Sequence, residues 1–376
     1  MSFKSRGKRI IEEVILRAQQ IDKYDVGETI RSLAVKTGIS PSEILKLNSN
    51  ENFFVPLNFL REILRQVIEE IDPRIYPRDE FRELREALSS YLGVPADNIM
   101  IGTGSDQLID LAARLFLRDG DEALSIDPTF AIYERCVKSQ GAIYRTVSLR
   151  EDFSLDLDAI MASITPKVKI IFLCSPNNPT ANQFRREDIL RLAEEFNGLV
   201  ALDEAYADFA DTTLINEASE LDNLMVFRTF SKVFGLAGLR VGYAVAGDRL
   251  AKTINERIQM PYSVSITALK AATKILKKID CVKKFIGELG AERSRLIDAL
   301  NRMGGVRAFP SQTNFVLFQV DRDSSAVYRA LLNRGIIVRN IGKVLRFENC
   351  LRVTVAPALM MERFIKGLWE VLCENA

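Results

Sequence analysis

The sequence predicts an α/β fold, in which a large domain holds a mostly parallel mixed sheet flanked by helices and a smaller α+β domain follows it. Between residues 98 and 246, short apolar runs alternate with segments of helical periodicity. Polar motifs fall where the apolar runs end, which is where open α/β sheets bind ligands. The length of 376 residues exceeds that of one ordinary domain.

Six apolar runs in the central part are predicted to be the strands of this sheet. They are Asn98–Gly102, Glu122–Ile126, Lys169–Cys174, Leu199–Asp203, Leu224–Arg228 and Arg240–Ala246. Apolar residues spaced by threes and fours predict helices between them, as over Ser105–Leu117 and Arg186–Phe196.

The C-terminal third has the pattern of a smaller unit. Residues 258–304 have helical periodicity throughout. Three strand-like runs and one helical run follow: Asn314–Val320, Ser324–Asn333, Ile336–Arg339 and Leu351–Val355. We expect a large domain over residues 49–257, and a small domain made of residues 258–376 with an N-terminal arm and helix, residues 1–48.

Composition narrows the class of protein. The formal net charge is +1, so nothing points to a nucleic-acid or an anionic membrane partner. No apolar run approaches the roughly 20 residues that span a bilayer. The N-terminal segment Met1–Ile21 is charged and is typical of an amphipathic helix rather than a signal peptide, so we expect a cytoplasmic enzyme. Five scattered cysteines lack metal-type spacing, and we expect them to be reduced core residues without a metal.

The chain contains no histidine. This excludes Ser-His-Asp and Cys-His catalysis as well as histidine metal sites. A general base must then be a lysine, a carboxylate, a tyrosine, a cysteine or a cofactor.

One lysine, Lys232, lies between hydroxyl residues in an apolar, glycine-rich segment. Burial disfavours a charged amine and lowers its pKa, which makes Lys232 a candidate to form a Schiff base with an aldehyde. Thr229, Ser231 and Arg240 are donors suited to a phosphate. An aldehyde with a phosphate tail indicates pyridoxal 5′-phosphate.

Three further motifs end predicted strands, and each has a structural alternative. The turn Gly102–Asp106 offers helix N-terminal amides to an anion, or is a helix start capped by Ser105 or Asp106. Asn178 precedes a proline, so it marks a turn or supplies an amide to a ligand oxygen, and its bond to Pro179 is of the kind that tolerates the cis form. Asp203 is a partner for a pyridinium N–H, or a structural aspartate.

In their order along the chain these motifs resemble the class I and II, fold type I, aminotransferases that use pyridoxal phosphate, and the resemblance covers nearly the whole chain. Within them the chain is most similar to the histidinol-phosphate aminotransferases. The residues that carry this narrower resemblance are Asn48–Asn52, Ile75–Pro77, Gly104–Asp106, Phe234–Arg240, Ile337–Arg339 and Cys350–Arg352. The chain departs from the family pattern at Ala181, where the family has glycine, and at Phe53, where it has proline.

The resemblance implies a role for each cofactor-site residue. Lys232 would bind the cofactor and shuttle a proton, and Asp203 would pair with the ring nitrogen. Tyr206 and Asn178 would donate to the phenolic oxygen, and Phe130 would stack on the ring. The phosphate would be held by Gly104, Ser105, Asp106, Thr229, Ser231 and Arg240. Tyr76 would reach the cofactor phosphate of the neighbouring subunit, which implies a homodimer.

The resemblance also implies the substrates, L-histidinol phosphate and glutamate or 2-oxoglutarate. Arg352 and Arg339 would bind their anionic groups, because a guanidinium suits both carboxylate and phosphate. Tyr24 and Asn50 would complete the substrate site, while Arg339 has the alternative of a surface arginine. Three other functions stay open: an aromatic amino acid aminotransferase, a threonine-phosphate decarboxylase, and a catalytically silent regulator that binds the cofactor.

Overall fold

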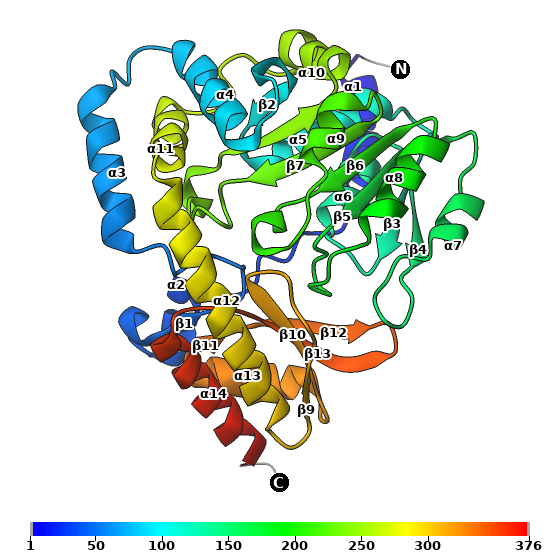
Figure 1. The fold of residues 1–376 in the computed structure, drawn as a ribbon. Coiled ribbons are helices and arrows are strands. Elements are labelled where there is room, and N and C mark those ends of the chain that lie inside the picture. Colours follow the sequence, from blue (N-terminus) through cyan, green and yellow to red (C-terminus); the bar gives the residue numbers. More distant parts are fainter. Residues whose placement is uncertain (1–2, 374–376) are drawn as a thin grey trace.

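The computed structural model describes residues 3–373, which form two main sheets that lie apart, each with its own helices (Figure 1). The larger sheet has seven strands in the order β2-β8-β7-β6-β5-β3-β4. Its strands are β2 (Ile99–Gly102), β3 (Glu122–Asp127), β4 (Ile143–Ser148), β5 (Val168–Cys174), β6 (Leu199–Asp203), β7 (Leu224–Thr229) and β8 (Gly242–Ala246). Only β8 runs antiparallel to its neighbours among these strands, so the predicted mostly parallel mixed sheet is confirmed.

Both faces of the central strands β5, β6, β7 and β8 are buried, as is typical of sheets covered by helices. Along β5 the fully buried Ile170 and Phe172 belong to one apolar cluster, and Ile171 and Leu173 belong to another.

The helices of this part are α3 (Leu57–Glu70), α4 (Asp79–Leu92), α5 (Gly104–Phe116), α6 (Ile132–Ser139), α7 (Leu157–Ala162), α8 (Arg186–Glu195), α9 (Ile215–Glu220), α10 (Asp248–Thr253) and α11 (Ile266–Leu276).

The smaller sheet is antiparallel and has the order β12-β13-β10-β9. Its strands are β9 (Val306–Ala308), β10 (Phe315–Val320), β12 (Arg339–Val344) and β13 (Phe347–Thr354), and its helices are α12 (Ile279–Asn301), α13 (Ser324–Asn333) and α14 (Ala358–Cys373). A parallel pair, β1 (Leu45–Lys46) with β11 (Ile336–Ile337), joins the N-terminal part to this unit. Two helices precede β1 in the chain, α1 (Phe3–Gln19) and α2 (Ile30–Thr37).

The structure differs from the sequence-based elements in three places. Residues 258–304 contain the two helices α11 and α12, but residues 259–265 of this predicted helical region are not helical. The run Ile336–Arg339 is split between β11 and the start of β12, because its two ends pair with different partners. Strand β4 was missed, because an edge strand with few buried residues lacks a strong apolar pattern.

The predicted division after residue 257 remains a prediction. Helix α11 lies beyond that point but packs against α3 and α4. Lys270 forms an ion pair with Glu83 of α4, and Lys274 forms one with Glu70 of α3. Any domain boundary therefore has to account for the association of α11 with the larger part.

All five cysteines are free. Cys136, Cys174 and Cys350 are buried as predicted, but Cys281 and Cys373 are exposed, so the prediction of a core position was wrong for these two. Cys281 lies in the first turn of α12 and Cys373 at the end of α14, at helix ends that face solvent. Among residues 3–373, no helix combines the length and apolarity that a membrane crossing requires.

Candidate active site

A cavity of about 620 Å³ opens where the parallel strands of the larger sheet end, and the smaller sheet closes its other side. Strands β5, β6 and β7 end at the same edge, with Cys174 paired in register to Asp203. Most predicted site residues line this cavity: Tyr24, Asn50, Ser105, Asp106, Phe130, Asn178, Asp203, Tyr206, Thr229, Ser231, Lys232, Arg240, Arg339 and Arg352. The fold therefore brings together residues that lie more than 300 positions apart in the chain.

Lys232 follows the end of β7, and its amine lies inside the cavity. The amine Nζ donates to the backbone carbonyls of Ser49 at 3.2 Å and Asn50 at 3.3 Å. Burial, helped by the positive charge of Arg352, lowers the pKa of Lys232 to about 8. About a tenth of the amine is therefore neutral and nucleophilic at pH 7, several hundred times more than for an ordinary lysine.

Asp203, the last residue of β6, is a buried carboxylate at the cavity wall. Its Oδ1 accepts a hydrogen bond from the backbone N–H of Ala205 at 3.0 Å, and its Oδ2 accepts one from the hydroxyl of Tyr133 at 2.8 Å. Burial raises the pKa of Asp203 to about 6. Sequence reasoning missed Tyr133, because nothing in the pattern of α6 links it to a strand end 70 residues later.

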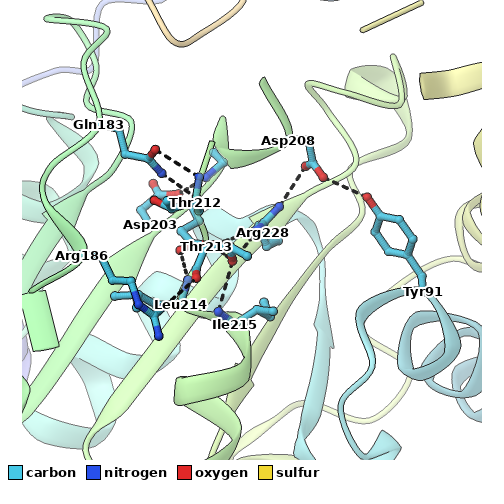
Figure 2. A network of polar contacts seen from close by, with 12 residues as sticks. Tyr91, Gln183, Arg186, Asp203, Asp208, Thr212, Thr213, Leu214, Ile215 and Arg228 are labelled. Atoms are coloured by element: carbon cyan, nitrogen blue, oxygen red, sulfur yellow. Dashed lines mark hydrogen bonds and ion pairs between the residues drawn. The ribbon is translucent and has the colours of Figure 1, made fainter. Parts of the chain in front are cut away.

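A buried ion network joins the ends of β6 and β7 (Figure 2). Glu204 follows Asp203, and its Oε2 accepts from Nε of Arg228 at 3.0 Å. Arg228 precedes Thr229, and its Nη1 lies 3.0 Å from Oδ2 of Asp208. Further hydrogen bonds join Tyr91, Thr213 and Leu214 to these charged groups. The network therefore joins the strand ends that carry Asp203 and Thr229. The sequence analysis did not identify this network.

A second wall has the features of an anion site. The turn before α5 places Gly104 at φ 75°, where a Cβ would lie 2.7 Å from Nη2 of Arg240. A Cβ at Gly242 would lie 2.5 Å from the backbone nitrogen of Ser105. Thr103 is the N-cap and makes no side-chain capping bond, so the alternative of a helix start capped by Ser105 or Asp106 is wrong. The first amides of α5 are therefore free of such a cap, as an anion site requires.

Arg240 stands beside these amides in the left-handed conformation, with φ 51°. Its Nη1 donates to the Ser231 hydroxyl at 3.3 Å, and its Nη2 pairs with Oδ2 of Asp106 at 3.1 Å. Hydroxyl, guanidinium and amide donors thus converge on one corner of the cavity.

Arg352, on β13 of the smaller sheet, faces the opposite side of the cavity. Its Nη2 donates to the carbonyl of Asn48 at 2.9 Å, and its Nη1 donates to Oδ1 of Asn178. Its Nε is buried without a hydrogen-bond partner among the described residues. Burial lowers the pKa of Arg352, but a guanidinium stays charged, so this donor is available for an anionic ligand.

The second predicted arginine has a different setting. Nη1 of Arg339 lies 3.0 Å from Oδ2 of Asp25, so an existing ion pair competes with any substrate anion. Asn340 and Lys343 of the same strand also line the cavity, although the sequence analysis did not single them out. Tyr24 lies at the cavity wall and is 45% exposed.

Asn50 is held by contacts from both parts of the molecule. It is buried with φ 54°, and its Nδ2 donates to the Tyr206 hydroxyl at 2.9 Å. Its backbone N–H donates to Oγ1 of Thr354, and its carbonyl accepts from Nδ2 of Asn314. The side chain therefore positions Tyr206 inside the cavity.

Tyr76 does not line the cavity. It is 74% exposed and stacks on Tyr262, with ring centroids 4.7 Å apart. The Asn-Pro-Thr-Ala segment has two special backbone features: the Asn178–Pro179 bond is cis, and Ala181 has φ 66°. Alanine thus adopts the left-handed conformation that glycine adopts with less strain.

Comparison with known proteins places this cavity in a family. The model of the aminotransferases of class I and II matches residues 42–368. The chain belongs to the class I and II aminotransferases. A histidinol-phosphate aminotransferase of a Thermoanaerobacter species is 39% identical over 329 residues, which cover 87% of this chain and 93% of that protein.

Two solved structures are similar to this aminotransferase over most of its length. The histidinol-phosphate aminotransferase of Sinorhizobium meliloti, in complex with pyridoxal 5′-phosphate, has a TM-score of 0.86 and 26% identity, and the match covers 96% of this chain and 97% of that one. The L-threonine-O-3-phosphate decarboxylase of Porphyromonas gingivalis has a TM-score of 0.76 and 25% identity, covering 88% of this chain and 100% of that one.

Proposed function

We propose that this aminotransferase uses pyridoxal 5′-phosphate to exchange an amino group between L-histidinol phosphate and 2-oxoglutarate, with glutamate as the partner amino acid. The observation that carries the chemistry is the convergence in one cavity of the amine of Lys232, the carboxylate of Asp203 and the anion-site donors around Arg240. The curated relative named a histidinol-phosphate aminotransferase, 39% identical over 87% of this chain, supports the substrate.

The donor set fits this cofactor group by group. Asp203 is a buried carboxylate whose hydrogen-bond donors among residues 3–373, Tyr133 and Ala205, are neutral, so a pyridinium N–H would be its cationic partner. Ser105, Thr229, Ser231 and Arg240 would hold the phosphate, beside glycines whose positions a Cβ would fill. Phe130 would cover one ring face, and Tyr206 and Asn178 would donate to the phenolic oxygen.

When bound, the cofactor supplies an aldehyde and an electron-withdrawing ring that stabilises negative charge at the substrate Cα. The residues of the chain handle the protons. Lys232 has a pKa of about 8 and takes and returns the proton at Cα as an amine. No histidine is available for this step anywhere in the chain. Asp203 would pair with the ring nitrogen and keep it protonated.

Arg352 would anchor the anionic end of each substrate in turn. Its buried Nε–H has no partner among the described residues, so a carboxylate or phosphate oxygen would satisfy it. Arg339 would assist after its ion pair with Asp25 opens, and Tyr24 would cover the bound substrate.

We propose further that the enzyme is a cytoplasmic homodimer. Ile75, Tyr76, Met260 and Tyr262 are large apolar residues with exposed side chains. The segment of Tyr262 adjoins the anion site, because Oγ1 of Thr103 donates to the carbonyl of Ser263. A second copy of the chain that covers this patch would bring Tyr76 to the cofactor phosphate. Sedimentation of the enzyme at several concentrations tests the dimer directly.

The substrate is tested by adding L-histidinol phosphate alone to the purified enzyme with bound cofactor, with phenylalanine and phosphothreonine in parallel. We expect the absorbance change from the aldehyde form to the amine form of the cofactor, at a much lower concentration of histidinol phosphate than of phenylalanine. Reaction with phenylalanine at equal efficiency would contradict the proposed substrate.

One alternative has structural support. The decarboxylase from Porphyromonas gingivalis shares the fold over 88% of this chain. Consumption of phosphothreonine with release of carbon dioxide, and no reaction with histidinol phosphate, would retain the cofactor site and replace the aminotransferase activity with a lyase activity.

A further inference from the structure

A fully buried tyrosine outside the predicted set makes direct contact with Asp203. Tyr133 belongs to α6, and its hydroxyl donates to Oδ2 of Asp203 at 2.8 Å. The backbone N–H of Ala205 donates to the other oxygen, Oδ1, at 3.0 Å. With one donor on each oxygen, the carboxylate cannot rotate without losing a charge-assisted hydrogen bond.

The ring of Tyr133 is held from two sides. It stacks on Phe172 of β5, with centroids 5.2 Å apart and an interplanar angle of 4°. It also meets Phe130 edge to face, with centroids 5.7 Å apart and an angle of 87°. Because Phe130 lines the cavity, Tyr133 joins the residue expected to cover the cofactor ring to the residue expected to bind the ring nitrogen.

We propose that Tyr133 is a positioning residue, whose hydroxyl keeps Asp203 oriented and ionised for the ring nitrogen of the cofactor. The proposal rests on the cofactor assignment made above and is independent of the amino donor.

The electrostatics are consistent with this role. Burial and the neighbouring carboxylate raise the pKa of Tyr133 well above its ordinary value, so the hydroxyl remains a donor throughout the physiological range. Burial raises the pKa of Asp203, whereas its bonds from Tyr133 and Ala205 act in the opposite direction. The other titratable groups that act on these two residues are Cys174, whose burial keeps its thiol neutral, together with Lys232, Asp106 and Tyr206.

Binding of pyridoxamine 5′-phosphate to the cofactor-free enzyme tests this proposal, because that ligand has the ring nitrogen but forms no bond to Lys232. Calorimetry between pH 5 and pH 8.5 would compare the wild type with Tyr133→Phe, Asp203→Asn and the double variant. Tyr144→Phe is the control, because Tyr144 packs against the same apolar cluster as Tyr133 but neither lines the cavity nor donates to Asp203.

We expect Tyr133→Phe to weaken binding at pH 7 by roughly 10- to 100-fold, the range for a lost charge-assisted hydrogen bond. We also expect the pH midpoint below which affinity falls to move upward from about 6. Tyr144→Phe should leave affinity and midpoint unchanged, and Tyr133→Phe should add little to Asp203→Asn.

Unchanged affinity and midpoint in Tyr133→Phe would overturn the proposal. So would an equal loss of affinity in the Asp203→Asn background, since it would show that Tyr133 acts through packing alone. If Tyr133→Phe does not fold, infrared spectra of the wild type and Asp203→Asn decide: the tyrosine bands must shift as Asp203 titrates in the wild type only. A protein that does not bind pyridoxamine phosphate at all would instead refute the cofactor assignment.

Discussion

The guanidinium of Arg228 and the carboxylate of Glu204 form an ion pair of 2.9 Å, in which both side chains are almost completely buried. The two residues stand next to Thr229 and Asp203, which line the cavity. The pair thus joins the ends of two neighbouring strands, β6 and β7. Asp208 also pairs with Arg228 and accepts a hydrogen bond from Tyr91 (Figure 2).

Replacing Arg228 with methionine should destabilise the protein by about 3–5 kcal/mol, because it leaves two carboxylates buried without a cation. The free energy of unfolding in urea measures this effect. Arg65→Met is the control, since Arg65 forms an exposed pair with Glu62 and should cost less than about 1 kcal/mol. Similar losses in both variants would contradict the structural role of the buried pair.

Asp203→Asn should stabilise the cofactor-free enzyme at neutral pH, although it removes the proposed partner of the ring nitrogen. The folded pKa of about 6 lies above the ordinary value of 3.8, so the folded state binds more protons between these values and loses stability as pH rises through them. This cost is fully present above pH 6 and corresponds to an upper limit of about 3 kcal/mol. Unfolding of both proteins at pH 8 and pH 4.5 should show a gain that shrinks at the lower pH, whereas a constant difference would count against burial as its cause.

Lys232→Ala should lose amino transfer by roughly 10⁴-fold or more while the fold is retained, because it removes the amine proposed to bond to the cofactor and to move the proton at Cα. Steady-state assays together with circular dichroism check this prediction. Lys274→Ala is the control, because it removes a lysine of similar exposure that pairs with Glu70 far from the cavity. Near-normal turnover in Lys232→Ala would exclude the proposed mechanism.

In the wild type, the rate at which the cofactor aldehyde reacts with the cofactor-free enzyme should rise through about pH 8, as Lys232 loses its proton. Stopped-flow absorbance from pH 6.5 to pH 9.5 measures this profile. A midpoint near 10.5, the ordinary value for lysine, would show that burial does not lower the pKa.

The two cavity arginines should differ in importance. Arg352→Gln removes a charge whose Nε–H has no partner in the described structure, and we expect kcat/KM to fall roughly 10²-fold for both substrates. Arg339→Gln should have a smaller effect, because Arg339 must break its ion pair with Asp25 before it can bind the substrate. The free energy of that pair offsets part of the free energy of substrate binding. Equal losses would indicate that Arg339 leaves Asp25 completely when substrate binds.

Gly104→Ala should weaken cofactor binding, because the new Cβ would lie 2.7 Å from Nη2 of Arg240 and displace the guanidinium from the anion site. Gly120→Ala is the matched control: Gly120 also has a positive φ, of 81°, but a Cβ there meets nothing within 4 Å. Both variants should lose about 1 kcal/mol of stability through backbone strain. Only Gly104→Ala should raise the dissociation constant of the cofactor, as measured by calorimetry.

The sequence predicted the larger sheet well because its strands are continuous apolar runs that end in polar motifs, as at Asp203 and Lys232. It could not predict contacts between side chains that are distant in the chain. The bond from Tyr133 to Asp203 and the pairing of Arg339 with Asp25 depend on how α6 and the N-terminal segment pack, which no local pattern encodes. The edge strand β4 escaped prediction because it lacks the burial that produces an apolar run.

The carbonyls that accept from the amine of Lys232 belong to Ser49 and Asn50, and Asn50 is in turn bound to Thr354 and Asn314 of the smaller sheet unit. Lys232, which follows β7 of the larger sheet, is therefore linked by hydrogen bonds through Asn50 to the opposite wall of the cavity. When one sheet shifts against the other, the hydrogen bonds of the amine lengthen or shorten with it. The reactivity of Lys232 therefore depends on how closely the two walls of the cavity approach each other.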